Sequence, residues 1–168
     1  TLSKGHDYIT VKEERTHIES YLEIQQFRYQ DILDYEIQMD EEIYGYIIPK
    51  LTLQPLVENA LYHGIKNKRG KGKILITGKK QGDKIIFQVI DNGKGMTEEE
   101  LNSLRKKMAG TDTGDEAKGF GVSNVNQRIK YYYGGEYGVF FESKENEGTN
   151  ATIIIAVSYT HLTLPTNS

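Results

Sequence analysis

Two side chains that can bind a metal ion or a phosphate stand four residues apart in the segment LQPLVENALYHGI (53–65). On a helix, Asn59 and His63 share one face, while the apolar residues of the segment form a stripe elsewhere. An amide oxygen can ligate Mg²⁺ among phosphate oxygens and waters, and a histidine beside it can donate to a phosphate. An amphipathic helix with a capping asparagine and a surface histidine explains the same residues. Taken alone, the segment favours that simpler interpretation.

A carboxylate followed by two glycines marks the segment VIDNGKGM (89–96). Asp91 ends an apolar run, and Gly93 and Gly95 lack the Cβ that would keep a planar ligand away from the backbone. The carboxylate can accept a hydrogen bond from the exocyclic amine of adenine. Asp-Asn-Gly is also common in turns, so a plain turn after a strand is the alternative.

A third segment, GFGVSNV (119–125), places Gly119 and Gly121 at the start of an expected helix. Free N–H groups and the positive end of the dipole make a helix N-terminus a good cradle for phosphate. A flexible helix start would use the same glycines, so this segment is weak evidence when taken alone.

Hydrophobic periodicity and turn residues predict the elements that position these segments. Thr10 and Glu13 have the spacing of a capping box, and apolar residues at helical spacing then predict a long helix over about 11–33. The other expected elements are a strand over 35–39, a helix ending near 65, strands over 74–77 and 84–91 joined at Gly82 and Asp83, a short helix capped by Thr97 and Glu100, a loop over 110–118, a helix over 121–133 stopped by Gly134 and Gly135, and strands over 137–143 and 150–157.

This order of elements predicts an α/β (α+β) two-layer sandwich, in which one mixed, largely antiparallel sheet carries its helices on one face. The length of 168 residues suits a single domain, which we assign to residues 1–157 together with its N-terminal helix. Residues 158–168 (SYTHLTLPTNS) lack periodicity, and we expect an appended tail there rather than an extension of the last strand. The first residue is a threonine, so we expect a piece of a longer protein.

The composition argues against several classes of protein. Hydrophobic residues make up 37% of the chain and charged residues 27%, which is a globular balance rather than a disordered one. The net charge of −3 gives no reason to expect nucleic acid as a partner. The sequence has no cysteine for disulfides or thiolate metal sites. It also has no apolar run near the roughly 20 residues that span a bilayer.

Taken together, the three segments occur in the order of the N, G1 and G2 boxes of the GHKL ATPase superfamily, and Gly148-Thr149 before the last strand resembles its G3 box. This superfamily has the Bergerat fold and includes gyrase-type topoisomerases, heat-shock chaperones, mismatch-repair ATPases and histidine kinases. The resemblance runs from about Thr10 to Val157. The phrases LQPLVENALYHGI, EIQQFRYQD and GFGVSNVNQRI most resemble the LytS/YesM-type sensor histidine kinases.

The resemblance implies ATP and Mg²⁺ as cofactors and suggests roles for individual residues. Asn59 would hold the Mg²⁺ that bridges the ATP phosphates, with Glu58 and His63 beside it in the catalytic set. Asp91 would accept from the adenine amine, together with a water held by Thr149. Residues 97–118 would form a lid that closes on nucleotide. The other residues expected to line the pocket or to contact the phosphates or the lid are His63, Gly93, Gly95, Met96, Gly119, Gly121, Val122, Asn124 and Arg128.

Two positions depart from the patterns of related proteins. Many sensor kinases carry a lysine three residues after the Mg²⁺ asparagine, where this chain has Tyr62, so phosphate neutralisation would fall to His63 or Lys66. GHKL hydrolases carry a water-activating glutamate one helical turn before the asparagine, where this chain has Pro55. Because proline cannot act as a base, direct hydrolysis of ATP is expected to be poor.

A histidine kinase also needs an acceptor histidine, and none of the four histidines, His6, His17, His63 and His161, lies in a phrase that resembles the family's acceptor box. The resemblance therefore implies transfer to a histidine of the parent's dimerisation and phosphoacceptor domain, followed by relay to a response regulator. It also implies a cytoplasmic domain of a bacterial protein anchored in the cell membrane, and we expect the isolated piece to be monomeric. The alternatives are an anti-sigma-type serine kinase, a nucleotide-binding module without transfer activity, and a protein-interaction domain.

Overall fold

The computed structural model describes residues 7–66, 68, 70–110 and 120–157. The helices and strands in chain order are β1 (Tyr8–Thr10), α2 (Val11–Arg28), β2 (Leu33–Met39), the 3-10 helix η1 (Glu41–Ile43), β3 (Ile47–Pro49), α3 (Gln54–Asn59), the π-helical segment η2 (Ala60–Ile65), β4 (Gly72–Gln81), β5 (Lys84–Asp91), α4 (Glu98–Met108), α5 (Phe120–Tyr133), β6 (Gly138–Lys144) and β7 (Gly148–Ala156). Apart from Gly110, the expected loop over 110–118 lies outside the described residues, as does the expected tail over 158–168.

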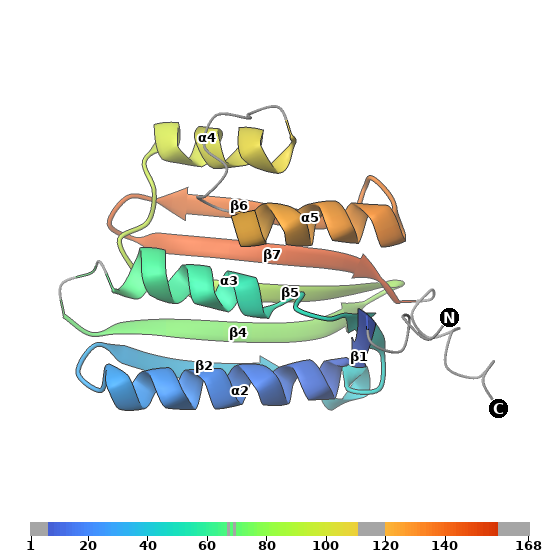
Figure 1. Cartoon of the computed structure of the whole chain (residues 1–168), viewed down its shortest axis with the longest axis horizontal. Coiled ribbons are helices and arrows are strands. Elements are labelled where there is room, and N and C mark those ends of the chain that lie inside the picture. Colours follow the sequence, from blue (N-terminus) through green and yellow to red (C-terminus); the bar gives the residue numbers. More distant parts are fainter. Residues whose placement is uncertain (1–6, 67, 69, 111–119, 158–168) are drawn as a thin grey trace.

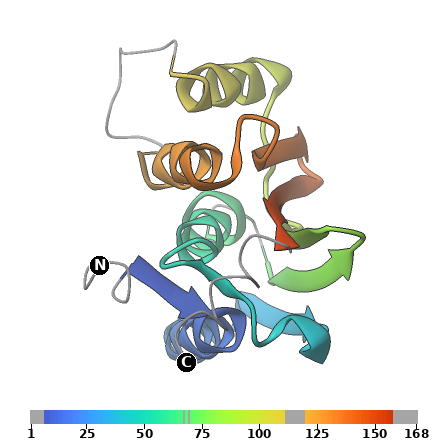
Figure 2. The same cartoon turned by 90° about the vertical axis from the view of Figure 1, so that its right-hand side faces the viewer.

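Five strands form one sheet in the order β2-β4-β5-β7-β6. Strands β2 and β4 are parallel, with Leu33 opposite Gly72, and each other neighbouring pair in this sheet is antiparallel. Figures 1 and 2 show two layers, with helices α2, α3, α4 and α5 on the same face of the sheet. The predicted two-layer sandwich with a mixed, largely antiparallel sheet is confirmed.

A second, two-stranded sheet ties the chain entering α2 to the chain entering α3. Strands β1 and β3 pair antiparallel, with Thr10 opposite Ile47. Thr10 is also the N-cap of α2: its hydroxyl accepts from Glu13 N at 3.1 Å, and the Glu13 carboxylate accepts from Thr10 N at 2.9 Å. The predicted capping box is confirmed, and α2 and α3 start from the same corner of the fold.

The predicted end of α2 is wrong, because the helix stops at Arg28 rather than near residue 33. Tyr29 closes it, and its carbonyl oxygen accepts from both Ile32 N and Leu33 N at 3.0 Å. Leu33 is already the first residue of β2 and pairs with Gly72. Pairing in the sheet therefore overrides the helical spacing that Leu33 would have continued.

An apolar core fills the space between the helices and the sheet. Burying one such side chain contributes roughly 1.5–3 kcal/mol, so this layer fixes α3, η2 and α5 against the central strands. The largest fully buried side chains are Phe87, Ile18, Leu22, Leu33, Ile43, Ile48, Leu53, Leu56, Leu61, Ile65, Ile74 and Ile76.

Two predicted turns are confirmed. Gly82, with φ of +64°, lies between β4 and β5, which pair antiparallel as a hairpin. Gly134, with φ of +117°, ends α5, and its N–H donates to Lys130 O at 2.9 Å. Across the described parts of the chain, no helix is both long enough and apolar enough to cross a membrane.

Candidate functional site

Asp91, the last residue of β5, is almost fully buried, with 6% of its surface exposed. Its Oδ1 accepts from Gly93 N at 2.8 Å, and the backbone N–H of Thr149, opposite it on β7, also donates to the carboxylate. Burial raises the pKa of Asp91 from 3.8 to about 6, although these two hydrogen bonds and the charge of Lys68 act to lower it. A buried carboxylate with a raised pKa is a candidate ligand-binding group.

The π-helical segment η2 lies directly against Asp91. A Cβ added at Gly64 would stand 2.6 Å from Asp91 Oδ1, and a Cβ added at Gly93 would stand 2.3 Å from the carbonyl carbon of Gly64. Lys94 N also donates to Gly64 O at 3.3 Å. The loop after β5 therefore rests on the backbone of η2, and Gly93 contacts this backbone.

Two glycines with positive φ bring the loop between β6 and β7 against the same region. A Cβ added at Gly148 (φ +121°) would stand 2.0 Å from Asp91 O. A Cβ added at Gly95 (φ +66°) would stand 2.0 Å from Lys144 O. Other residues would be strained at these φ values and would also overlap the neighbouring backbone, so only glycine fits.

Ser143 joins three parts of this region through one hydroxyl. Its Oγ accepts from Met96 N at 2.8 Å, donates to Gly148 O at 2.9 Å, and lies 2.8 Å from Thr149 Oγ1. Since the single proton of Ser143 goes to Gly148 O, Thr149 donates its own proton to Ser143. The lone pairs of Thr149 then remain available as acceptors.

Asn59 stands where α3 passes into the π-helical segment η2. At the end of η2 the backbone bonds five residues back, as in a π-helix: Lys66 N donates to Leu61 O at 2.9 Å. Such turns are rare and are often found at functional sites. Asn59 is half-buried and His63 is exposed. Both predicted residues thus lie on the continuous helix that touches Asp91 through Gly64.

The side chains next to Asn59 lie against other residues of α3 and against α2. Glu58 accepts from Gln54 Nε2 at 3.4 Å. The Tyr21 hydroxyl on α2 lies near Tyr62 and Glu58. Its pKa is raised, mainly by burial and to a smaller extent by these two neighbours. Tyr62 is 42% exposed, and the Lys66 ammonium lies 4.7 Å from the centre of its ring. Lys66, one of the two residues expected to neutralise phosphate, is therefore held over an aromatic ring.

The start of α5 lies beside the first turn of α3, where a Cβ added at Gly121 would meet Pro55 Cβ at 3.5 Å. Gly121 is exposed, whereas the side chain of Val122 is buried in the core. The first backbone N–H groups of a helix have no partner within it, so this end can offer donors to an anion. Gly119 lies outside the described residues.

Arg128 and Asn124 lie further along α5, in a surface hollow that also includes Gln127 and Tyr131. Arg128 Nη2 donates to Leu51 O at 2.9 Å. Leu51 precedes α3 whereas Asn59 ends it, so the guanidinium is held at the other end of that helix. The structure does not bring Arg128 to Asn59, and its expected role toward phosphate or lid stays a prediction.

Residues 49–159 match the family of histidine kinase-, DNA gyrase B- and HSP90-like ATPases, which is more than half of the chain. The chain belongs to this ATPase family. The predicted GHKL resemblance is thereby confirmed. Helix α2 and strand β2 lie before the first matched residue, so the match begins at the segment that leads into α3.

Curated relatives of this ATPase-family chain include sensor kinases. The sensor histidine kinase YesM of Bacillus subtilis is 34% identical over 149 residues, which are 89% of this chain and 24% of YesM. The sensor protein LytS of Bacillus anthracis is 31% identical over 147 residues, 88% of this chain and 24% of LytS. The uncharacterised protein YwpD of Bacillus subtilis is 36% identical over 150 residues, 89% of this chain and 50% of YwpD. The predicted resemblance to LytS/YesM-type kinases is confirmed, and the chain spans half or less of these relatives.

Solved structures show the same fold. The catalytic domain of the histidine kinase ThkA superposes with a TM-score of 0.66 at 20% identity, covering 89% of this chain and 96% of that one. ThkA has also been solved in complex with the response regulator protein TrrA, and that chain superposes with a TM-score of 0.63 at 20% identity over 89% of this chain and 41% of its own. At this identity the likeness concerns the fold of the ATPase domain.

The Mg²⁺ that the resemblance implies would be held by the amide of Asn59 together with phosphates and waters. Within the described ranges, no group of three or more His, Cys, Asp or Glu side chains is placed to hold a metal. Mg²⁺ at nucleotide sites commonly takes one or two protein oxygens and completes its shell with phosphates and waters. The half-buried amide of Asn59 is compatible with that arrangement.

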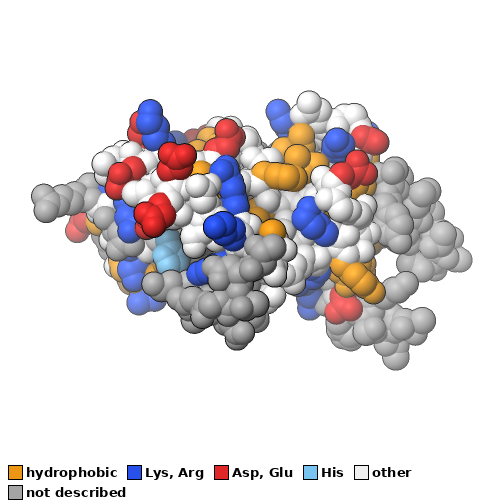
Figure 3. Space-filling view, turned by 90° about the horizontal axis from the view of Figure 1, so that it is seen from above, with side chains coloured by type: hydrophobic (Ala, Val, Ile, Leu, Met, Phe, Trp, Pro, Cys, Tyr) orange, Lys and Arg blue, Asp and Glu red, His pale blue; other side chains and the backbone are white. Residues whose placement is uncertain are grey.

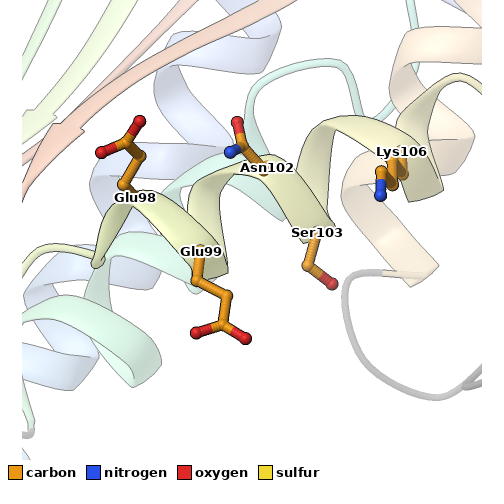
Figure 4. Close-up of a pocket in the computed structure, with 5 residues that line it drawn as sticks. All are labelled: Glu98, Glu99, Asn102, Ser103 and Lys106. Atoms are coloured by element: carbon orange, nitrogen blue, oxygen red, sulfur yellow. The ribbon is translucent and has the colours of Figure 1, made fainter.

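Helix α4 opens the segment expected to form the lid, and it is anchored on its inner side. Arg105 Nη2 donates to Phe141 O at 2.7 Å, and Asn126 joins α4 to β6 by donating to Met108 O at 3.2 Å and accepting from Val139 N at 2.9 Å. The outer side is polar: Figure 4 shows Glu98, Glu99, Asn102, Ser103 and Lys106 around a hollow on α4. Seen from above, acidic and basic side chains lie side by side (Figure 3) rather than forming a patch of one sign.

Three residues that hold the site together were not singled out from the sequence. A glycine inside an apolar helical segment was a usable signal for Gly64, since it lowers helix stability and therefore suggests a packing reason. Ser143 and Asn126 carried no such signal. Their roles depend on pairing across β6 and on contacts to α4, which no local pattern reveals.

Proposed function

We propose that the chain binds Mg²⁺–ATP between η2, the end of β5 and the start of α5, as the catalytic domain of a sensor histidine kinase. The observation that carries the proposal is the buried Asp91 carboxylate, enclosed by Gly64 and Gly148 in a chain of an ATPase family. Asp91 would accept from the adenine amine, and Thr149 would hold a water beside it. Gly93, Gly95 and Met96 would shape this end of the pocket.

At the other end, Asn59 would hold Mg²⁺, which when bound neutralises charge on the phosphates. The backbone N–H groups of Gly121 and Val122 would donate to phosphate oxygens, assisted by the positive end of α5. Gly119, Asn124, His63 and Arg128 complete the expected set. To reach a phosphate, the Arg128 guanidinium would have to give up its hydrogen bond to Leu51 O. The expected lid over the nucleotide is residues 97–118, of which 111–118 lie outside the described residues.

Phosphoryl transfer fits the site better than hydrolysis. Pro55 stands one helical turn before Asn59, where a hydrolase of this kind would carry its glutamate, so no side chain there can activate water. Glu58 is the nearest carboxylate in the sequence, but it accepts from Gln54 and lies near Tyr21 of α2. The same proline disfavours a serine kinase of the anti-sigma type.

The partners of the whole protein follow from its relatives and are part of the proposal. The γ-phosphoryl group would pass to a histidine in the dimerisation and phosphoacceptor domain of the parent, and from there to a response regulator. The crystallised complex of ThkA with TrrA supports a partner of that class. The parent would be anchored in a bacterial membrane with this domain in the cytoplasm, and the piece alone would be monomeric.

Calorimetric titration tests nucleotide binding by this chain. Mg²⁺–ATP or a non-hydrolysable analogue is titrated into the wild type, Asp91→Asn, Asn59→Ala and the control Asp83→Asn, whose exposed aspartate lies in the β4–β5 turn. The wild type and the control should bind. Asp91→Asn should lose binding, and Asn59→Ala should bind weakly without response to Mg²⁺. A wild type that binds no nucleotide contradicts the proposal.

Transfer is tested separately, in the longer parent protein supplied with γ-labelled ATP. Label in an acid-labile, base-stable form is expected on the parent and should be absent from Asn59→Ala. Nucleotide binding without any such label would favour the second candidate, a module that signals by binding alone.

A further inference from the structure

Glu14 on α2 is fully buried, which is unusual for a carboxylate. Its Oε2 accepts from Leu53 N at 2.9 Å and from Gln54 N at 3.4 Å. Both N–H groups belong to the start of α3, whose N-cap residue Leu53 makes no side-chain cap of its own. A carboxylate from a different helix, 39 residues away in the sequence, therefore serves as the cap.

With this cap, the backbone donors at the start of α3 are all satisfied. Glu14 takes the first two, and Pro55 has no N–H to satisfy. The next two donors, Leu56 N and Val57 N, bond to Leu53 O at 3.0 and 3.1 Å. A carboxylate at this position also faces the positive end of the helix dipole. Removing it would leave two N–H groups without their acceptor inside the protein.

Helix α2 runs beside α3 (Figure 1) and also contacts the helix that α3 and η2 form beyond its start. In the middle, Tyr21 lies near Glu58 and Tyr62. At the end, the Lys66 ammonium lies 5.3 Å from the centre of the Tyr29 ring. Helix α2 and its C-cap Tyr29 thus contact the helix that carries Asn59 near its start, middle and end, and the cap is the contact that fixes its start.

We propose that Glu14 is a positioning residue for the nucleotide site, because it fixes the start of the helix that ends at Asn59. This inference rests on the proposed role of Asn59. Glu14 acts through α3 and not by contact with nucleotide, since it lies at the opposite end of that helix. Helix α2 precedes residues 49–159, so the cap comes from outside the part of the chain that matches the ATPase family.

The test is a double-mutant cycle, with the affinity for Mg²⁺–ATP measured by calorimetry well below the unfolding temperature. The four proteins are the wild type, Glu14→Ala, Asn59→Ala and the double variant. If Glu14 acts through Asn59, Glu14→Ala weakens binding at least about fivefold in the wild type. It then causes no further loss in the Asn59→Ala background. No loss in the wild type, or an equal loss in both backgrounds, overturns the proposal.

Two further variants separate positioning from folding. Glu23→Gln changes an exposed carboxylate on the same helix and should bind like the wild type. Glu14→Gln keeps an acceptor for Leu53 N but loses the charge, and should bind with intermediate affinity. Should the alanine variant fail to fold, the cycle is run with Glu14→Gln, and wild-type affinity there overturns the proposal.

The cycle also distinguishes this inference from the proposed function. If the wild type binds no Mg²⁺–ATP, the proposed function itself fails. If the wild type and Asn59→Ala behave as proposed while the Glu14 variants lose only thermal stability, the carboxylate is purely structural. In that case this inference alone fails.

Discussion

The proposed site has two ends that are built in different ways. At the Asp91 end, formed by Asp91, Gly64, Gly95, Gly148 and Ser143, each glycine lies against another part of the protein's own structure. At the α5 end, formed by Asn59, His63 and the start of α5, Gly121 is exposed and comes no closer than ordinary contact to Pro55. The first end is assembled by the fold, whereas the second is the N-terminus of a helix, whose first backbone N–H groups have no partner within that helix.

This difference means that the glycines of the two motifs are needed for different reasons. In the Asp-x-Gly-x-Gly segment, a side chain would collide with backbone atoms before any ligand arrives. In the Gly-x-Gly segment, a Cβ added at Gly121 would come no closer than 3.5 Å to any atom of the described residues. Replacing a glycine of the first motif is therefore expected to lower both stability and nucleotide binding. Replacing a glycine of the second is expected to lower binding alone.

The largest effect is expected for Gly95→Ala, compared with Gly82→Ala as a matched control. The two glycines have nearly equal φ values, +66° and +64°, so the cost of the left-handed backbone is shared, at about 1–2 kcal/mol. A Cβ at Gly95 would also stand 2.0 Å from Lys144 O, whereas a Cβ at Gly82 meets no atom of the described residues within 4 Å. Urea unfolding should show Gly95→Ala less stable than Gly82→Ala by at least about 2 kcal/mol. Equal losses would mean that the Asp91 end is not tightly assembled.

A second prediction concerns the pH dependence that burial gives to Asp91. Its pKa is raised from 3.8 to about 6, so the folded state binds more protons than the unfolded state between these values. The stability that Asp91 contributes is therefore fully present below pH 3.8 and is lost as the pH rises through about 6. Relative to Asp91→Asn, which does not titrate, the wild type should lose up to about 3 kcal/mol between pH 4 and 7.

Urea unfolding of both proteins at a series of pH values measures this difference, with Asp83→Asn as the exposed control. A difference between wild type and Asp91→Asn that stays constant with pH would contradict the raised pKa. Nucleotide affinity should show the opposite trend and fall as the pH drops through about 6, because a protonated carboxyl group has lost acceptor capacity for the adenine amine.

The elements of the fold that depend on local sequence were predicted, whereas those that depend on distant partners were not. Apolar periodicity, the Thr10 capping box and the Gly82 turn were local signals, and the structure confirms each of them. The end of α2 was wrong because Leu33 is recruited into β2 by pairing with Gly72, a partner distant in the sequence.

Within the site, the Asp-x-Gly-x-Gly motif identified Asp91 and the two glycines after it, but not the residues that these glycines contact. Gly64 against Asp91, and Ser143 between Met96 and Gly148, are contacts between segments that only folding brings together. The same holds for Glu14, whose burial under the start of α3 cannot be read from its place in a polar helix. The residues that carry the chemistry could be predicted from local sequence, whereas the residues that they contact in the fold could not.

The smallest effect on stability is expected for Gly121→Ala at the α5 end. The added Cβ would make only ordinary contact with Pro55 at 3.5 Å, and alanine is the better helix former, so the free energy of unfolding should change by less than about 1 kcal/mol. Mg²⁺–ATP affinity should nevertheless fall, because a methyl group at the helix start would stand where phosphate oxygens approach the backbone N–H groups. Gly135→Ala, whose added Cβ has no atom of the described part of the chain within 4 Å, is the control and should bind normally. If Gly121→Ala binds as tightly as the wild type, the start of α5 is not the phosphate cradle, and the contrast between the two ends disappears even though the Asp91 end stands.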